Sequence, residues 1–550
     1  MAYNTCLFAV AAPSPDAVAL AERRVARLAR WFDGLAPTVV RAAGDTRAGV
    51  VAGAFVFGAG EPRPSGDGGG AAVLEWGVSE VGPGARLDVA ASGAVFRTAA
   101  TDITAGYRCR DAISTHAVVA AFLGSGEVGV RPAAVPELLA FGHPANLGHV
   151  VAGITAVGAG SECRVDGRGL TEAESPGRWE LVAEERAYAE VVVTMEAALE
   201  RSAATGSLAL GLSGGRDSRV VAVALRALGL EASAYTLGAA ASAECREASS
   251  VARVVGLPHS VIEPSLLPDE DVAVTALRDA RWTEGCAPAR LVAGQSRLGA
   301  DVNLTGAGGE LGRAFHYAYT ARNFRRPSLA DLASVWRPQA RLDSSIAAPA
   351  RDAVAAAASE ALERAAATGV TGWRTLDVVY AQQRMRRWGR TGIAPTSGVA
   401  YAPVFLDPQV AAALVSLPLV ERLTDGFHRR YLSERMPELV PPKPRRQRAA
   451  VPSWVRRAVA QRRGTRRPAE PGASPLPRTH PQTHAHLVET VARHPLVVDQ
   501  LGAAWGETLQ RALRAGDGRA VDDALLLAGP VALAEAIRSL NQSAERELSA

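Results

Sequence analysis

The heptapeptide Leu212-Ser213-Gly214-Gly215-Arg216-Asp217-Ser218 decides the fold of the second half of the chain, because it joins a predicted strand to a predicted helix. The strand is the apolar run 207–212, and the helix is the run 218–228. Adjacent glycines permit a tight turn in which the backbone approaches a ligand without an intervening Cβ atom. Free N–H groups and the positive end of the helix then point at one place, which suits a phosphate group.

The polar residues of the heptapeptide refine this prediction. Ser213 and Ser218 add hydroxyl donors, whereas Asp217 alone would repel phosphate and therefore predicts a bridging Mg²⁺. The spacing of the glycines excludes the usual P-loop and the dinucleotide fingerprint. The alternative interpretation is a structural strand–helix turn with a capping serine.

Predicted strands alternate with predicted helices on both sides of this turn. Strands at 232–237, 261–262 and 302–304 and helices at 218–228 and 243–255 predict an α/β domain with a parallel sheet covered on both faces. Helical patterns follow at 346–368 and after residue 487. The first part is β-rich, with runs at 6–12, 49–58, 72–81 and 87–98 and helical spacing at 112–123 and 135–141. We predict domains at 1–170 and 179–550, a linker at 167–178 and a mobile loop at 456–486.

Composition excludes several protein classes. With 550 residues, 48% of them hydrophobic and 21% charged, the chain is neither a disordered polyampholyte nor a small disulfide scaffold. We predict neither a membrane span nor a signal peptide. The five scattered cysteines favour a cytoplasmic protein without structural zinc, and 60 basic against 56 acidic residues give no reason to expect nucleic acid. Only one of the basic residues, Lys443, is a lysine.

The heptapeptide resembles the pyrophosphate loop (PP-loop) of ATP-pyrophosphatases, and further stretches narrow the resemblance to the asparagine synthetase family. These stretches cover roughly 180–460, and they are Ala234-Tyr235-Thr236-Leu237-Gly238, Gly256-Leu257-Pro258-His259, Leu304-Thr305-Gly306-Ala307-Gly308-Gly309-Glu310, Tyr401-Ala402-Pro403-Val404-Phe405-Leu406-Asp407, and Lys443 with Pro452 and Trp454. A weaker resemblance in the first half implies a degenerate class II glutamine amidotransferase-like domain with the αββα layers of Ntn amidohydrolases.

The resemblance implies ATP and Mg²⁺ as cofactors and assigns a role to each matching residue. The residues that would line the nucleotide are Leu212, Thr236, Leu237, Thr305 and Gly306, and those that would hold the departing pyrophosphate are Ser213, Gly214, Gly215 and Ser218. Asp217 and Glu310 would bind Mg²⁺, although Glu310 stands where the family has an aspartate. Lys443 would stabilise negative charge on the phosphates or on the tetrahedral intermediate.

Two departures from the family pattern bear on the activity. A glutamine-dependent member needs a cysteine at position 2, where this chain has Ala2, and we interpret Cys6 as a core residue of a strand. The amine must therefore arrive as free ammonia or as an amino group of the substrate. β-Lactam synthetases carry a Tyr–Glu pair, whose positions here fall at Ala307 and at Val399 or Ala400, so β-lactam formation is disfavoured.

These observations predict an ATP-dependent, AMP-forming amide ligase that does not hydrolyse glutamine. A lasso-peptide macrocyclase or a related natural-product amide synthetase fits best. An ammonia-dependent asparagine synthetase-like enzyme and a non-catalytic nucleotide- or peptide-binding relative remain alternatives. The expected substrate bears a carboxylate and an amine, and a leader-peptide-binding protein and a protease are expected partners. Of the other candidates, His259 is interpreted as packed, and His316, Tyr317 and Tyr319 as facing either the acceptor pocket or the core.

Overall fold

The computed structural model describes most of the chain. The described residues are 5–32, 37–42, 50–57, 72–76, 85–90, 93–98, 106–158, 161–173, 187–262, 280–281, 284–286, 299–317, 327–336, 346–388, 400–440, 488–515 and 518–548. Position 2, Tyr319, Lys443 and the predicted mobile loop 456–486 lie outside them.

Two antiparallel sheets form the first half of the chain. One sheet has the strand order β2 (Pro37–Ala42), β3 (Val50–Phe57), β1 (Thr5–Ala11), β8 (Ala112–Ser114), β7 (Tyr107–Cys109) and β9 (Thr155–Ala156). The other has the order β11 (Gly169–Ala173), β10 (Glu162–Asp166), β6 (Gly93–Arg97), β5 (Ala85–Ala90) and β4 (Ala72–Trp76). Alternate residues of both sheets, such as Leu7 and Phe96, meet in a shared core, so the sheets stack face to face.

Helices α1 (Pro15–Trp31) and α2 (Ala117–Ser125) cover the other face of the first sheet, where Phe8 and Phe122 belong to one core. Ser14 caps α1 by accepting the N–H of Ala17 at 3.2 Å. The described residues thus give three layers, and the fourth layer of the expected αββα arrangement stays a prediction.

Three predictions in this half were wrong. The predicted linker 167–178 contains the strand β11, because Gly169–Ala173 pairs with β10. The predicted helix 112–123 begins as the strand β8, because Ala112–Ser114 pairs with both β1 and β7, and α2 starts only at Ala117. The predicted strand 87–98 is a hairpin of β5 and β6. Gly93 has φ 139°, and a Cβ there would lie 2.5 Å from the carbonyl oxygen of Val165, so the apolar run conceals a turn.

The second half contains a parallel five-stranded sheet with the order β14 (His259–Ile262), β13 (Ala232–Leu237), β12 (Leu208–Gly211), β15 (Val302–Thr305) and β16 (Ala400–Pro403). The chain builds from β12 towards β14 and then returns to β15 on the opposite side of β12. In parallel sheets, a crevice forms at the carboxyl ends of two neighbouring strands when the connections after them run to opposite sides of the sheet. Here these strands are β12 and β15. The fold therefore places a ligand site between the loops that follow β12 and β15.

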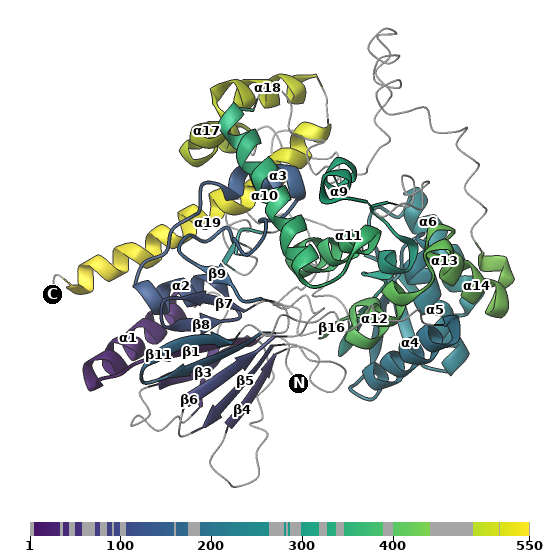
Figure 1. Ribbon diagram of the computed structural model, residues 1–550, viewed down its shortest axis with the longest axis horizontal. Helices are drawn as coiled ribbons and strands as arrows, with labels where there is room; N and C mark the ends of the chain where they lie inside the picture. The colour runs from purple at the N-terminus through teal and green to yellow at the C-terminus, as the bar shows by residue number, and fades with distance from the viewer. Residues whose placement is uncertain are drawn as a thin grey trace.

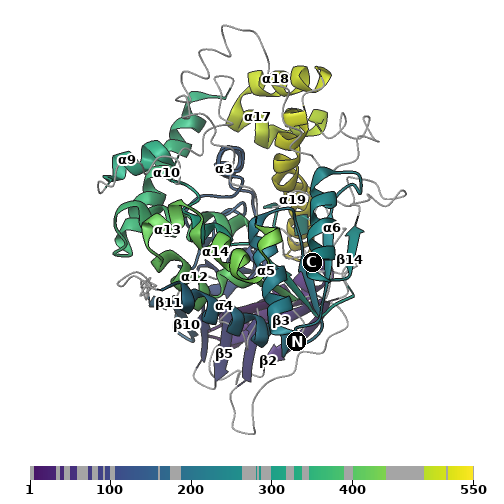
Figure 2. The ribbon, with the colours of Figure 1, turned by 90° about the vertical axis from the view of Figure 1, so that its right-hand side faces the viewer.

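Helices α4 (Tyr188–Ala203), α5 (Arg216–Leu228) and α6 (Ala243–Val255) share the large core of this half with one face of the sheet. α4 and α5 lie beside α14 (Gly426–Arg435) in Figure 2. The opposite face contributes the smaller cluster of Ala209, Tyr235 and Ile262. The prediction of a parallel sheet is confirmed, and the described helices on it pack against one face.

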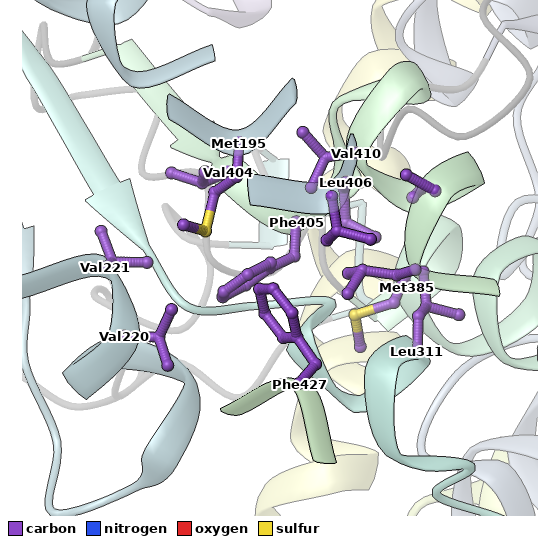
Figure 3. Packing of buried hydrophobic residues seen from close by; sticks show 14 of the residues in the cluster. Met195, Val220, Val221, Leu311, Met385, Val404, Phe405, Leu406, Val410 and Phe427 are labelled. Atoms are coloured by element: carbon purple, nitrogen blue, oxygen red, sulfur yellow. The ribbon is translucent and has the colours of Figure 1, made fainter. Parts of the chain in front are cut away.

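Two aromatic side chains, Phe405 and Phe427, pack in the large core of this half. In Figure 3, Phe405 and Phe427 lie between Val220 of α5 and Leu311. Their ring centroids are 6.4 Å apart, and the rings are nearly perpendicular at 89°, which is a favourable edge-to-face geometry. This packing fixes the start of α14 against α5.

The remaining described elements are mostly helical. They are α3 (Ala134–Phe141), the 3₁₀ turn η5 (Gly309–Arg313), α9 (Leu329–Val335), α10 (Ala348–Ala367), η7 (Gly372–Arg374), α11 (Thr375–Val379), the π-helix η8 (Tyr380–Trp388), η10 (Val404–Leu406), α12 (Pro408–Ser416), α13 (Leu419–Leu423), η11 (Pro437–Leu439), α17 (Pro495–Leu501), α18 (Ala503–Arg514) and α19 (Gly518–Leu548). Within the described part of the chain, no helix has the length and apolar character of a membrane span.

The end of the chain packs on its beginning. α19 runs across the first half in Figure 1, and residues of α17, α18 and α19 share a core with α1 and α2. Trp31 donates its Nε1–H to the carbonyl of Ala536 at 3.0 Å. Asn541 bonds both backbone groups of Val128, at 2.8 and 3.1 Å. The division into domains 1–170 and 179–550 stays a prediction, and the C-terminal helices belong to the core of the first half.

Candidate functional site

The heptapeptide forms the predicted turn between β12 and α5. Gly215 caps the helix, so Asp217 and Ser218 lie in its first turn. Ser218 Oγ accepts the N–H of Ser213 at 3.1 Å and lies 3.0 Å from Ser213 Oγ, which in turn accepts the N–H of Gly215 at 3.1 Å. The two hydroxyl groups therefore hold the turn in shape.

A second loop, which follows β15, packs directly against the N-terminus of α5. A Cβ atom at Gly306 would lie 2.4 Å from the backbone nitrogen of Ser218, and one at Gly309 would lie 2.6 Å from Asp217 Oδ1. Only glycine permits this approach. The structure thus brings the predicted residues Asp217, Ser218, Gly306 and Glu310 to one place.

One guanidinium group connects the two carboxylates of the site. Nη2 of Arg313 lies 2.7 Å from Asp217 Oδ2 and 3.6 Å from Glu310 Oε1. Tyr380, at the start of the π-helix η8, donates its hydroxyl hydrogen to Glu310 Oε2 at 2.7 Å. Both carboxylates are mostly shielded from solvent, with side-chain exposures of 15% for Asp217 and 24% for Glu310.

His428 on α14 approaches Asp217 from the other side. Its Nε2 lies 2.9 Å from Asp217 Oδ1, its Nδ1 lies 2.9 Å from Asp425 Oδ1, and Asp425 pairs in turn with Arg216 at 2.5 Å. Burial alone would lower the pKa of His428, but the two carboxylates raise that pKa to about 9. Burial also opposes ionisation of Asp217, yet His428 and Arg313 hold the pKa of Asp217 below its usual value. Asp217 and His428 are therefore both ionised at neutral pH.

Thr236 joins β13 to the turn. Its hydroxyl donates to the carbonyl of Leu212 at 2.7 Å and lies 2.9 Å from Nε2 of His259. Nδ1 of His259 lies 3.2 Å from the hydroxyl of Ser249. Burial lowers the pKa of His259, which is consistent with the interpretation of a packed neutral ring. The predicted nucleotide-lining residues thus come from the carboxyl ends of β12, β13 and β15.

Arg219 ties the turn to the segment that precedes Lys443. Its guanidinium donates to the carbonyl of Gly214 at 3.0 Å and to the carbonyl of Leu439 at 2.8 Å. Val440 is the last described residue before Lys443, which lies outside the described residues.

The sequence profile of the asparagine synthase family matches residues 193–467, half of the chain. The chain belongs to this family. The comparison with curated proteins gives no match. The matched region contains both loops, all strands of the parallel sheet and Lys443. It supports an ATP-dependent amide ligase, an enzyme that forms carbon–nitrogen bonds, and enzymes of the family typically use ATP with Mg²⁺.

In this asparagine synthase family member, the predicted metal ligands Asp217 and Glu310 contact cationic side chains and do not form an open set of oxygen ligands. Each oxygen of Asp217 faces a cationic group, and the guanidinium of Arg313 contacts Glu310 as well. Among the described residues, no group of three or more His, Cys, Asp and Glu side chains is placed to hold a metal ion. As arranged here, Asp217 and Glu310 do not fit a protein-bound Mg²⁺.

The acceptor-side candidates separate into two groups. His316 lies beside Tyr380 at a ring distance of 5.6 Å, and burial, with Arg384 nearby, lowers the pKa of His316 to about 4, so the ring is neutral. Tyr317 is fully buried, and its hydroxyl donates to Asp377 at 2.7 Å, which makes it a core residue. Val399 lies outside the described residues, and Ala400 opens β16.

The burial of Cys6 confirms the prediction that it is a core residue. It lies in β1 with 4% exposure, and its Sγ is 3.3 Å from the hydroxyl of Ser114. Sequence reasoning missed His428 and Arg313 as site residues. No local pattern marks either of them, because their partners are distant in sequence or belong to another loop.

Proposed function

We propose that this protein is an AMP-forming amide ligase that adenylates a carboxylate and transfers the acyl group to an amine without using glutamine. One observation carries the proposal. The loops after β12 and β15 meet at the N-terminus of α5, where Gly306 packs against the backbone of Ser218. A helix N-terminus beside two glycine loops at a switch point of a parallel sheet suits a nucleotide polyphosphate.

The reaction has two steps in this site. An oxygen of the substrate carboxylate attacks the α-phosphorus of ATP, and the bond to the bridging oxygen breaks, so pyrophosphate leaves towards the turn 213–218. An amine then attacks the carbonyl carbon of the acyl adenylate. A carbon–nitrogen bond forms, AMP leaves with the electron pair, and the amine gives up a proton. Activation is needed because a free carboxylate is a poor electrophile.

Positive groups of the chain would stabilise the negative charge that develops on the phosphates. The first turn of α5 supplies backbone N–H groups, and Arg313 supplies a guanidinium beside Asp217. We assign Lys443 to the same role, because Leu439, four residues before it in the sequence, accepts a hydrogen bond from Arg219, which also bonds Gly214 of the turn. Mg²⁺ enters this scheme as part of the substrate, bound to ATP.

Residues of the first half of the chain indicate which amine accepts the acyl group. Ala2 replaces the nucleophile of glutamine-dependent relatives, and Cys6 is a buried residue of β1. We therefore infer that the amine belongs to the substrate itself, which makes macrocyclisation of a precursor peptide through a side-chain carboxylate the favoured case. A leader-peptide-binding protein and a protease are the partners that this proposal requires.

A non-catalytic relative is the rival function, since the hydroxyls of Ser213 and Ser218 bond within their own turn. The test is ATP–pyrophosphate exchange without glutamine, in the presence of candidate acids that include any short precursor peptide encoded next to the gene. Exchange that Asp217→Asn abolishes supports the ligase. The matched control is Asp301→Asn, because Asp301 bonds Ser207 at the opposite end of the sheet. Absence of nucleotide turnover with every acid would establish the rival.

A further inference from the structure

We propose that the guanidinium of Arg313, and not a metal ion bound by the protein, is the cation between Asp217 and Glu310. The contacts of these three side chains carry the proposal. One guanidinium nitrogen lies within 2.7 Å of Asp217 and 3.6 Å of Glu310. Tyr380 fixes the other oxygen of Glu310, and His428 faces the other oxygen of Asp217.

The guanidinium of Arg313 already supplies a positive charge between the two carboxylates. It contacts both Asp217 and Glu310, whose side chains are mostly shielded from solvent. A divalent ion placed beside this guanidinium would meet like-charge repulsion in a largely buried site, which is strongly unfavourable.

The geometry also disfavours a metal ion. Mg²⁺ requires oxygen ligands at about 2.0 to 2.1 Å in near-octahedral directions. To bind between Asp217 and Glu310, the ion would have to displace Arg313, whose side chain is 23% exposed and would lose both of its carboxylate partners. Asp217 would also have to turn away from His428, which burial confines.

The proposal changes the role that the sequence assigns to Asp217. Asp217 holds Arg313 and His428 at the start of α5, and the partly exposed guanidinium of Arg313 lies beside the turn where the proposed function puts pyrophosphate. Only this consequence rests on the proposed function. The absence of a metal site between the two carboxylates is a property of the free protein, so it is tested without nucleotide.

The experiment titrates the full-length protein with Mn²⁺ at neutral pH and measures free Mn²⁺ by electron paramagnetic resonance. We expect the unmodified protein and the Asp217→Asn variant to bind Mn²⁺ equally, because Asp217 contributes to no metal site. Arg313→Met keeps an unbranched side chain but removes the guanidinium and its charge, so it should create a Mn²⁺ site at least about tenfold tighter than any background binding. The double variant with Asp217→Asn should lose that site.

Arg201→Met is the matched control, because it removes a guanidinium that pairs with Asp407 at 2.8 Å and not with Asp217 or Glu310. Loss of that guanidinium should create no comparable site. Two results would overturn the proposal: a Mn²⁺ site in the unmodified protein that Asp217→Asn abolishes, or a folded Arg313→Met protein that gains none. Circular dichroism checks folding, and if Arg313→Met does not fold, Arg313→Gln replaces it while the titration of the unmodified protein still decides.

Discussion

His428 on α14 lies 2.9 Å from Asp217 on α5, and this contact joins α14 to the turn between β12 and α5. The imidazole is buried and sits between Asp217 and Asp425. Its protonated form therefore stabilises the folded site, because both ring nitrogens then carry a proton, whereas the neutral ring keeps one N–H and leaves one of the two carboxylates facing a bare nitrogen.

The first prediction concerns pH. The pKa of His428 is raised from 6.5 to about 9 in the folded protein, so the stabilisation is fully present below pH 6.5 and is lost as the pH rises through about 9. We expect the thermal midpoint of unfolding to fall over this range, by an amount that reflects on the order of 3 kcal/mol. His428→Gln should be less stable at neutral pH and should show a smaller fall.

The matched control for this prediction is His259→Gln. Burial lowers the pKa of His259, so its protonation disfavours folding only at acidic pH. The control should therefore keep the fall between neutral and alkaline pH. An unchanged pH profile in His428→Gln would show that the ring is not protonated in the folded protein.

A second prediction tests the contact between the two loops. In Gly306→Ala the new methyl group would meet the backbone nitrogen of Ser218 at 2.4 Å, and backbone cannot move aside as a flexible side chain does. We expect a destabilisation of about 1 to 3 kcal/mol and weaker ATP binding, measured by thermal unfolding and by calorimetric titration. Gly299→Ala, where a Cβ meets nothing within 4 Å, should change neither quantity. Unaltered ATP affinity in Gly306→Ala would place the nucleotide away from this loop.

Local sequence patterns were sufficient for the elements around the turn. The predicted helix 243–255 and strand 232–237 coincide with α6 and β13, because glycine, serine and apolar periodicity mark their ends within a few residues. The heptapeptide likewise forms the predicted strand–turn–helix. Its glycines indicate a tight turn, because glycine permits backbone conformations and close approaches that other residues do not.

The long-range part of the site could not be predicted in this way. Arg313 and His428 look like ordinary residues of a turn and a helix, and only the folded chain brings them to Asp217. β16 was missed for the same reason, since Ala400–Pro403 is too short to show a period and becomes a strand by pairing with β15. The return of α19 to the first half depends on tertiary packing that no local window contains.

A third prediction concerns that return. Asn541 on α19 satisfies both the N–H and the carbonyl of Val128, and Asn541→Ala leaves these backbone groups without their partner. We expect a loss of about 1 to 3 kcal/mol in local stability. Hydrogen exchange followed by mass spectrometry should show faster exchange in α19 and at Val128. Gln542→Ala, an exposed neighbour on the same helix, should exchange as the unmodified protein does, and equal protection in both variants would mean that the contact contributes nothing.

The last prediction uses the fact that Lys443 is the only lysine of the chain. An amine-directed acylating reagent should modify one side chain besides the terminal amine, and mass spectrometry of peptides identifies it. If Lys443 contacts the phosphates as we propose, ATP or pyrophosphate should slow this modification at least about tenfold, because an ammonium paired with phosphate has a raised pKa and is shielded. The terminal amine serves as the internal control, since its acylation should not respond to ATP. Equal rates with and without ATP would remove Lys443 from the phosphate site and leave Arg313 as the cation that faces it.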